Sequence, residues 1–448
     1  MAYQHQQTGG PPPVNASSYP GYGPPPPIPP NHPTAGYQGG YAPPQGGYTA
    51  PPGQYPGSYA PPHGPPAGQS PYPPTPLYDA PQTYPDYPPA PQFQGPPQGY
   101  YPPPQAPLWY LGSPIPDPFA PPAQYGVQKV PGYDPISDCE AIRKATKGFG
   151  TNDSMLITTL IPLSALKMDA LAECFMSRVG KKLSTVIESE TSSYFRMGLM
   201  GLVAGPLGWD VDLAYQALAG VGTNEALLTE IILGRPSSEV RLLANAYRHK
   251  YKRDLEDMIR GDLSGKTERM FVMALNANRP LDNMPVNQAE VARDVETLYR
   301  AGQAKLGTDE MAFCDILINR SQAHIAAVIG MYGNKHRSLS KVIKSEFSGH
   351  MRAGLLYIVE GAKPKRDGQG IWRDAKLIDQ AMVGLGTKDK QLVWRIVRAQ
   401  WDPRRMEAIK EAYLSRTKKK LDIRVASETS GSYKKLMVAL VNSAAVKK

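Results

Sequence analysis

The chain has 448 residues, of which 49 are Lys or Arg and 39 are Asp or Glu, so its formal net charge is +10. No stretch approaches the roughly 18 consecutive apolar residues of a membrane-spanning helix, and the first residues, MAYQHQQTGGPPPV, lack the basic and apolar regions of a secretory signal. Three cysteines, Cys139, Cys174 and Cys314, have no metal-ligand spacing and suit a reducing compartment. These features disfavour an integral membrane protein and predict a cytoplasmic one.

Residues 1–130 contain 40 of the 49 prolines and 16 of the 26 tyrosines, but only four charged residues. Such a segment cannot bury enough apolar surface to offset the entropy of ordering it, so we expect a disordered tail. Units such as GYQGGYAPPQGGY combine extended polyproline preference with regularly spaced aromatic rings, which favours peptide docking or self-association. An inert flexible spacer is the alternative. The remainder carries 48 basic and 36 acidic residues, so the basic charge belongs to the folded part.

A Gly-Thr motif recurs four times after the tail. Its copies are GFGTND (148–153), GVGTNE (220–225), KLGTDE (305–310) and GLGTKD (384–389), with threonines 72, 85 and 79 residues apart. A local motif at near-constant spacing indicates an array of similar modules. We therefore divide the folded part into four repeats, at 131–205, 206–282, 283–364 and 365–448.

Each motif precedes a helical pattern of apolar residues. Met155, Leu156 and Leu160 illustrate it in the first repeat, and Leu392, Val393 and Ile396 in the fourth. Spacings of one, three and four residues place such side chains on one buried helix face. We expect the motif threonine to be the N-cap, and an acidic residue to follow in the first turn. These acidic residues are Asp153, Glu225, Asp309 and Asp389. Strand signals are scarce, so the sequence predicts an all-α domain with about five short helices per repeat.

A glycine-rich link between helices is by itself most often a plain turn. Glycine also lets backbone carbonyls converge into a cation cage, or amides into an anion nest. Here a second element accompanies every motif: Glu190, Asp262, Glu346 and Glu428 follow the second glycine, or its equivalent, by 40, 40, 39 and 42 residues. A carboxylate beside a loop rich in backbone oxygens is what calcium requires, because calcium takes six to eight oxygen ligands. The spacing therefore predicts four calcium sites.

The stretches FGTNDSMLITTL and GVGTNEALLTEIILGRPSSEVRLLANAYRHKYKRDLEDMIRGDLSGKTERMFVMALNANRP (220–280) resemble annexin repeats, and the resemblance extends over about 133–445. It implies a curved all-α disc of four five-helix repeats, whose convex face binds calcium and acidic phospholipid such as phosphatidylserine. The tail is similar to the long amino-terminal regions of some annexins. That similarity implies recruitment of a partner, such as a penta-EF-hand protein.

The resemblance assigns three backbone carbonyls and one acid to each calcium. The ligands are Thr146, Gly148 and Gly150 with Glu190; Leu218, Gly220 and Gly222 with Asp262; Gly302, Lys305 and Gly307 with Glu346; and Met382, Gly384 and Gly386 with Glu428. Lys305 replaces a glycine, and the spacings of 39 and 42 depart from 40. We therefore rank the first two sites highest, then the fourth, then the third.

The residue between the glycines, or its equivalent, is apolar in every repeat: Phe149, Val221, Leu306 and Leu385. An open loop that admits an ion and a phosphate would ordinarily carry a polar side chain there, so we expect these residues to enter the membrane interface. The alternative is that they pack on their own helix. Lys147 and Lys388 lie in the loops and would add attraction to an anionic surface.

Other functions have weaker support in the sequence. GDLSGKT (261–267) resembles a phosphate-binding loop, but three residues rather than four separate its glycines and no strand pattern precedes it. No catalytic motif occurs, so we expect no enzyme. The positive charge alone would fit DNA or RNA, yet no nucleic-acid-binding motif is present. The alternative from another class is a calcium-independent helical scaffold for protein or RNA partners, in which the loops are only turns.

Overall fold

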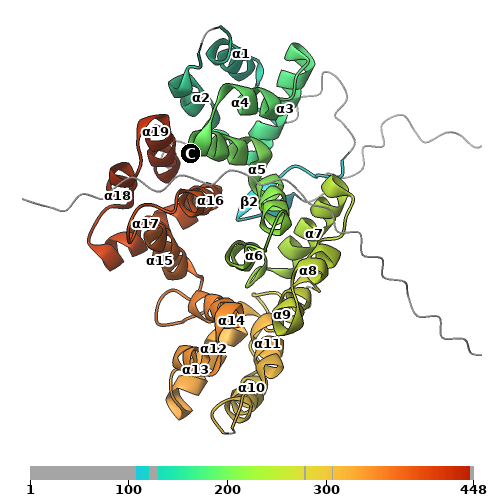
Figure 1. Ribbon diagram of the computed structural model, residues 1–448, viewed down its shortest axis with the longest axis vertical. Coiled ribbons are helices and arrows are strands. Elements are labelled where there is room, and N and C mark those ends of the chain that lie inside the picture. Colours follow the sequence, from blue (N-terminus) through green and yellow to red (C-terminus); the bar gives the residue numbers. More distant parts are fainter. Residues whose placement is uncertain (1–106, 121–129, 149, 277–278, 305, 444–448) are drawn as a thin grey trace, which may run out of the picture. The chain divides into compact units, whose positions relative to one another are not determined.

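A computed structural model describes residues 107–120, 130–148, 150–276, 279–304 and 306–443. The predicted disordered tail lies outside these residues up to residue 106 and again at 121–129. The described part of the chain from residue 107 onward belongs to one compact unit and contains 19 helices and two short strands (Figure 1). None of the helices in these ranges is long and apolar enough to cross a membrane.

The helices follow one another in four similar groups. The first group is α1 (Ile136–Ala145), α2 (Asp153–Leu160), α3 (Ala165–Val179), α4 (Leu183–Glu190) and the start of α5 (Ser193–Leu218). The second is the rest of α5 with α6 (Glu225–Ile232), α7 (Ser237–Tyr251), α8 (Leu255–Asp262) and α9 (Gly265–Leu275). The third is α10 (Gln288–Ala301), α11 (Glu310–Asn319), α12 (Gln322–Lys335), α13 (Leu339–Glu346) and α14 (Gly349–Gly361). The fourth is α15 (Ile371–Ala381), α16 (Asp389–Ala399), α17 (Pro403–Thr417), α18 (Leu421–Glu428) and α19 (Gly431–Val441).

Helix α5 serves two repeats because it is broken in the middle. Gly205 has φ 70° and ψ 173°, which no helix accommodates, and Pro206 follows it. Proline disfavours a helical conformation in the residue before it, and its ring interrupts the helical hydrogen bonds. The two parts of α5 are the last helix of the first repeat and the first helix of the second. The prediction of an all-α fold with five helices per repeat is thus confirmed.

The predicted N-caps are wrong by one residue. The side chains of Asn152, Asn224 and Asp309 accept hydrogen bonds from backbone amides three residues later, at 3.0, 3.1 and 3.2 Å. The cap is therefore the residue after the motif threonine, where a short Asx side chain reaches the free amides of the first turn. Asp309 is consequently a cap and not a first-turn residue. Lys388 occupies the fourth position and makes no side-chain cap.

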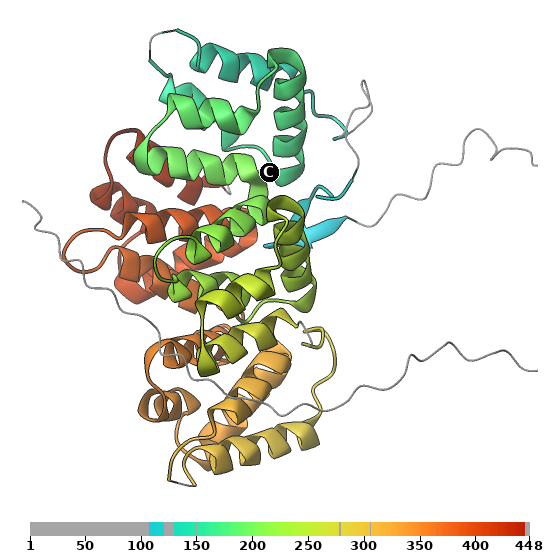
Figure 2. The ribbon, with the colours of Figure 1, turned by 45° about the vertical axis from the view of Figure 1, so that its right-hand side comes forward.

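The repeats share a buried aromatic residue at one position of their third helix. Phe175, Tyr247, Tyr332 and Tyr413 are the eleventh residues of α3, α7, α12 and α17, and each is at most 1% exposed. Between repeats, α16 and α19 pack against α5, α14 packs against α6, and α9 packs against α11 (Figures 1 and 2). The repeats are therefore joined by helix packing between the first and fourth and between the second and third.

A short hairpin precedes the first repeat. Strands β1 (Leu108–Tyr110) and β2 (Ser113–Ile115) pair antiparallel around a Leu111–Gly112 turn, in cyan in Figure 2. Tyr110 is only 1% exposed and donates its hydroxyl hydrogen to Asp210 at 2.9 Å, while the Leu111 amide donates to Glu239 at 2.9 Å. The predicted boundary of the disordered tail at residue 130 is therefore wrong for residues 107–120. Burial of apolar side chains and these two hydrogen bonds hold this segment.

Candidate metal centres

The paired glycines of the Gly-Thr loops in repeats one, two and four have nearly the same φ angles. These angles are 106° and 84° (Gly148, Gly150), 105° and 83° (Gly220, Gly222), and 113° and 79° (Gly384, Gly386). A Cβ atom at any of these positions would meet no atom within 4 Å, so the positive φ, and not space, requires glycine. In the third loop Gly307 has φ 83°, and Lys305 lies outside the described residues.

One backbone hydrogen bond closes every loop. The amide of the residue after the threonine donates to the last alanine of the preceding helix in all four repeats. The donors are Asn152, Asn224, Asp309 and Lys388, the acceptors Ala145, Ala217, Ala301 and Ala381, and the distances 2.8, 2.9, 2.8 and 2.8 Å. Of the predicted carbonyl ligands in the described part of the chain, only Met382 accepts a hydrogen bond from another described residue. The other carbonyls are available to an ion.

The motif threonine ties the loop to its acid. Thr308 donates its hydroxyl hydrogen to the Glu346 carboxylate at 3.0 Å, and Thr387 to the Glu428 carboxylate at 2.6 Å. Thr151 instead donates to the backbone carbonyl of Glu190 at 2.8 Å. In the second repeat Asp262 is the last residue of α8, which packs against α5, the helix that ends just before the loop. The structure thus brings loop and acid together directly in repeats one, three and four.

The apolar residues at the loop tips point away from the protein. Val221, Leu306 and Leu385 are 109%, 104% and 109% exposed. The alternative in which they pack on their own helices is therefore wrong for these three, and Phe149 lies outside the described residues. Lys147 and Lys388 are exposed in the same loops. Because these three side chains are fully exposed at the loop tips, they are available for contact with another surface.

The donors available at the loops fit calcium better than other metals. Within the described ranges no group of three or more His, Cys, Asp or Glu side chains could hold a metal. An ion at a loop would therefore be held by backbone carbonyls and one carboxylate. Hard oxygen ligands suit calcium, whereas zinc and copper prefer nitrogen and sulfur. The three cysteines are free thiols, and burial raises the pKa of Cys314 to about 12.

Side chains beside the loops also connect neighbouring repeats, which the sequence analysis did not predict. Lys266 pairs with Glu310 at 2.8 Å and His350 with Glu225 at 3.2 Å, both between repeats two and three. The hydrogen bond from Lys266 lowers the pKa of Glu310. Lys266 belongs to GDLSGKT, which spans the end of α8 and the start of α9 and follows no strand in the described chain, so that motif is not a phosphate-binding loop here. These two ion pairs therefore link the segments beside the candidate sites of repeats two and three.

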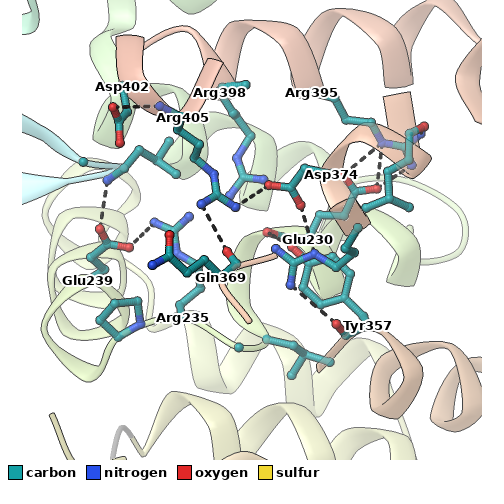
Figure 3. Close-up of a pocket in the computed structure, with 18 of the residues that line it drawn as sticks. Glu230, Arg235, Glu239, Tyr357, Gln369, Asp374, Arg395, Arg398, Asp402 and Arg405 are labelled. Carbon is teal, nitrogen blue, oxygen red and sulfur yellow. Dashed lines mark hydrogen bonds and ion pairs between the residues drawn. The ribbon is translucent and has the colours of Figure 1, made fainter. Parts of the chain in front are cut away.

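A second polar site, also unpredicted, is a cavity of about 290 Å³ between repeats two, three and four and the hairpin turn (Figure 3). Arg395 pairs with Glu230 through Nη2 at 2.6 Å, and Arg398 with Asp210 through Nε at 2.7 Å. The paired residues lie 165 and 188 positions apart, so no local pattern could show them. Glu230, Glu239 and Asp374 in the cavity wall each form an ion pair with an arginine, so we interpret the cavity as a charged seam between repeats.

Comparison with known proteins matches four segments to the annexin family model: 137–202, 210–274, 293–358 and 373–440. The chain is 47% identical to annexin C1 of Cryptococcus neoformans var. grubii over 75% of this chain and 71% of that protein. It is 36% identical to annexin A11 of Mus musculus over 74% of this chain and 65% of that protein. A structure of annexin A8 is 31% identical with a TM-score of 0.65, covering 70% of this chain and 97% of the other. One of chicken annexin V in complex with Zn²⁺ is 30% identical with a TM-score of 0.62, with the same coverage. The chain therefore belongs to the annexin family, which is known for calcium-dependent phospholipid binding.

Proposed function

We propose that this protein binds calcium at its Gly-Thr loops and, through the bound ions, attaches to acidic phospholipid membranes such as those containing phosphatidylserine. The observation that carries the proposal is the combination found at the loops. Positive-φ glycines leave carbonyls free, a carboxylate lies beside them, and an apolar side chain at the tip is fully exposed. The ligands are the carbonyls and acids named from the annexin resemblance, with Glu190 and Asp262 as the principal acids.

A site with one carboxylate binds calcium weakly, because affinity rises with the number of charged ligands. A phosphate oxygen of a lipid headgroup can complete the coordination. Ion and membrane then strengthen each other's binding by the same factor, as thermodynamic linkage requires. Several such sites on one molecule add avidity without any single strong contact. Weak sites therefore act as a switch that responds to calcium only where lipid is present.

The loop tips supply the contact with the membrane itself. Val221, Leu306 and Leu385 each gain about 1.5–3 kcal/mol when they leave water for an apolar environment. Lys147 and Lys388 add about 1 kcal/mol each near an anionic surface. Phe149, outside the described residues, has the corresponding tip position in the first loop. This contact is peripheral, and we propose a cytoplasmic protein that moves to membranes when calcium rises.

The tips provide the test of this proposal. The variant Val221→Ser with Leu385→Ser should need at least threefold more calcium for half-maximal sedimentation with phosphatidylserine vesicles, because two apolar contacts are lost. Leu281→Ser is the matched control, since Leu281 is 63% exposed but lies outside the loops. An unchanged calcium requirement in the double variant, or an equal effect in the control, contradicts membrane contact by the tips.

A binding protein, and not an enzyme, accounts for these observations. The alternative is a calcium-independent scaffold for protein or RNA partners, which predicts equal partner binding in calcium and in chelator.

We further propose that the Pro/Gly/Tyr-rich tail recruits a partner, such as a penta-EF-hand protein, or self-associates. Composition supports this, because 16 of the 26 tyrosines lie in residues 1–130. Replacing the tail tyrosines by Ser in the full chain should abolish concentration-dependent light scattering and partner capture, and unchanged values would contradict a role for the tail.

A further inference from the structure

The candidate site of the fourth repeat contains a cationic side chain of the protein itself. Arg424 lies in α18, one helical turn before Glu428. Its Nη1 atom is 2.9 Å from Oε1 of Glu428, and its Nη2 atom donates a hydrogen bond to the Met382 carbonyl at 2.5 Å. These partners are the acid and the first carbonyl of the proposed calcium site. The guanidinium therefore bridges two ligands that an ion would have to bring together.

The remaining oxygen of the acid is also engaged. Oε2 of Glu428 accepts the hydroxyl hydrogen of Thr387 at 2.6 Å, so both carboxylate oxygens have partners. A bidentate calcium ligand must offer both oxygens to the ion. The side chains of Arg424 and Glu428 are only 26% and 19% exposed, which limits their exchange with water. Charge-assisted hydrogen bonds of this kind are stronger than neutral ones.

The other repeats have no cation at the equivalent position. The residue four positions before the acid is Val186 in repeat one, Met258 in repeat two and Val342 in repeat three. Among the described residues, no Lys, Arg or His lies within ion-pair distance of Glu190, Asp262 or Glu346. The carboxylate of Glu346 accepts hydrogen bonds from the neutral hydroxyls of Thr308 and Ser345. The arrangement around Arg424 is thus specific to the fourth repeat.

We propose that the Arg424 guanidinium occupies the calcium position of the fourth repeat as a built-in cation. This inference rests on the proposed function, because it concerns one of the same loop sites. The guanidinium connects the Met382 carbonyl at the start of the loop to the Glu428 carboxylate without a metal ion. Calcium can enter only after Arg424 leaves, because two cations cannot share one carboxylate at contact distance without strong repulsion. The fourth site therefore binds calcium last.

The test isolates the fourth site in the full-length protein. In the variant Glu190→Gln, Asp262→Asn and Glu346→Gln, only the fourth acid remains, and calcium-dependent sedimentation with phosphatidylserine vesicles should be nearly lost. Adding Arg424→Met, which copies Met258, should lower the calcium requirement at least tenfold and increase the calcium-induced rise in Tm measured without lipid. Adding Arg416→Met instead is the control, because it removes the same charge from α17, where Arg416 pairs with Asp379.

The outcomes separate this inference from the proposed function. If the triple variant keeps full calcium-dependent binding, the fourth site works despite Arg424, and the inference is wrong while the proposed function stands. If Arg424→Met changes neither the calcium requirement nor the calcium-induced Tm rise, the inference is also wrong. Equal binding of the unaltered protein in calcium and in chelator overturns the proposed function itself.

The reciprocal substitution tests the same inference in a way that does not depend on whether the Arg424→Met variant folds. Met258→Arg places a guanidinium in the second site, where Met258 is half-buried. It should raise the calcium requirement of the otherwise unaltered chain as much as Asp262→Asn does, whereas Met258→Leu should leave it unchanged. A chain in which Met258→Arg behaves like Met258→Leu would contradict the idea that a cation at this position displaces calcium.

Discussion

At the scale of single residues, Asp374 shows how the charged seam contributes to stability. It accepts hydrogen bonds from Nε of Arg373 at 2.9 Å and Nη2 of Arg405 at 2.5 Å in the wall of the central cavity. Burial disfavours its charged form, but the two arginines outweigh this effect and lower the pKa to about 2, from an ordinary 3.8. The resulting stabilisation is about 2 kcal/mol. It is complete above about pH 5 and is lost progressively as the pH falls through 3.8, the ordinary pKa, and then through 2.

Urea unfolding of the unaltered chain and of Asp374→Asn at several pH values tests whether this stabilisation is lost as the pH falls. The difference in free energy of unfolding should be the same at pH 7 and pH 5 and should narrow by about 1 kcal/mol at pH 3, because Asp374 of the unfolded chain is then largely protonated while that of the folded chain is still ionised. Asp257→Asn is the control, since Asp257 is exposed and no ion pair involves it among the described residues. A difference in free energy of unfolding that is as large at pH 3 as at pH 7 would show that the two arginines do not lower the pKa of Asp374.

The sequence predicted the loop geometry from two signals: the presence of glycine, and an acid spacing that recurs in all four repeats. Positive φ at Gly148 and Gly150 follows from glycine, and the acid spacing placed Glu346 and Glu428 beside their loops, as the threonine hydrogen bonds show. The motif threonine is predicted to be the N-cap, whereas in repeats three and four its hydroxyl donates a hydrogen bond to the acid. Arg424 precedes Glu428 by four residues, a local spacing that could have indicated their ion pair, but its hydrogen bond to Met382, 42 residues away, depends on how α18 packs. Tertiary contacts of this kind leave no local pattern.

At the scale of elements, the hairpin shows the limit of arguments from composition. Residues 1–130 are rich in proline and poor in charge on average, but LWYLGSPI within them forms β1 and β2 and buries one or more side chains of each strand. Tyr110 and Ile115 are buried, whereas Trp109 is 55% exposed. Such a short segment becomes stable only because the core offers Asp210 and Glu239 as partners. An average over 130 residues cannot show this.

The turn of the hairpin can be tested with a matched pair of glycines. Gly112 has φ 71°, and a Cβ there would lie 2.6 Å from Oδ2 of Asp402, which caps α17. Gly132 has φ 73°, but a Cβ there would meet no atom within 4 Å. Gly132→Ala should cost about 1 kcal/mol from backbone strain alone, and Gly112→Ala about 1 kcal/mol more in thermal or urea unfolding. Equal costs would mean that the turn is not packed against Asp402.

At the scale of the whole molecule, the period of the Gly-Thr motif was enough to predict a four-repeat helical array, because each repeat has the same order of helices. It did not predict how the repeats meet. The pair Glu230–Arg395 joins the second repeat to the fourth, and Ser432 of the fourth donates to Asp153 of the first. Through such contacts the helices beside the proposed loop sites belong to one packed unit. We therefore expect the proposed sites to engage a membrane together and not one by one.

The most direct test of the central claim is calcium-dependent sedimentation with phosphatidylserine vesicles for the chain with Glu190→Gln and Asp262→Asn. The matched control is Glu188→Gln with Asp257→Asn, which removes the same charges from exposed positions of α4 and α8. The unaltered chain and the control should sediment in calcium and remain in solution in chelator. The site variant should need at least tenfold more calcium. Sedimentation that is equally strong in chelator, or a site variant indistinguishable from its control, would contradict the account.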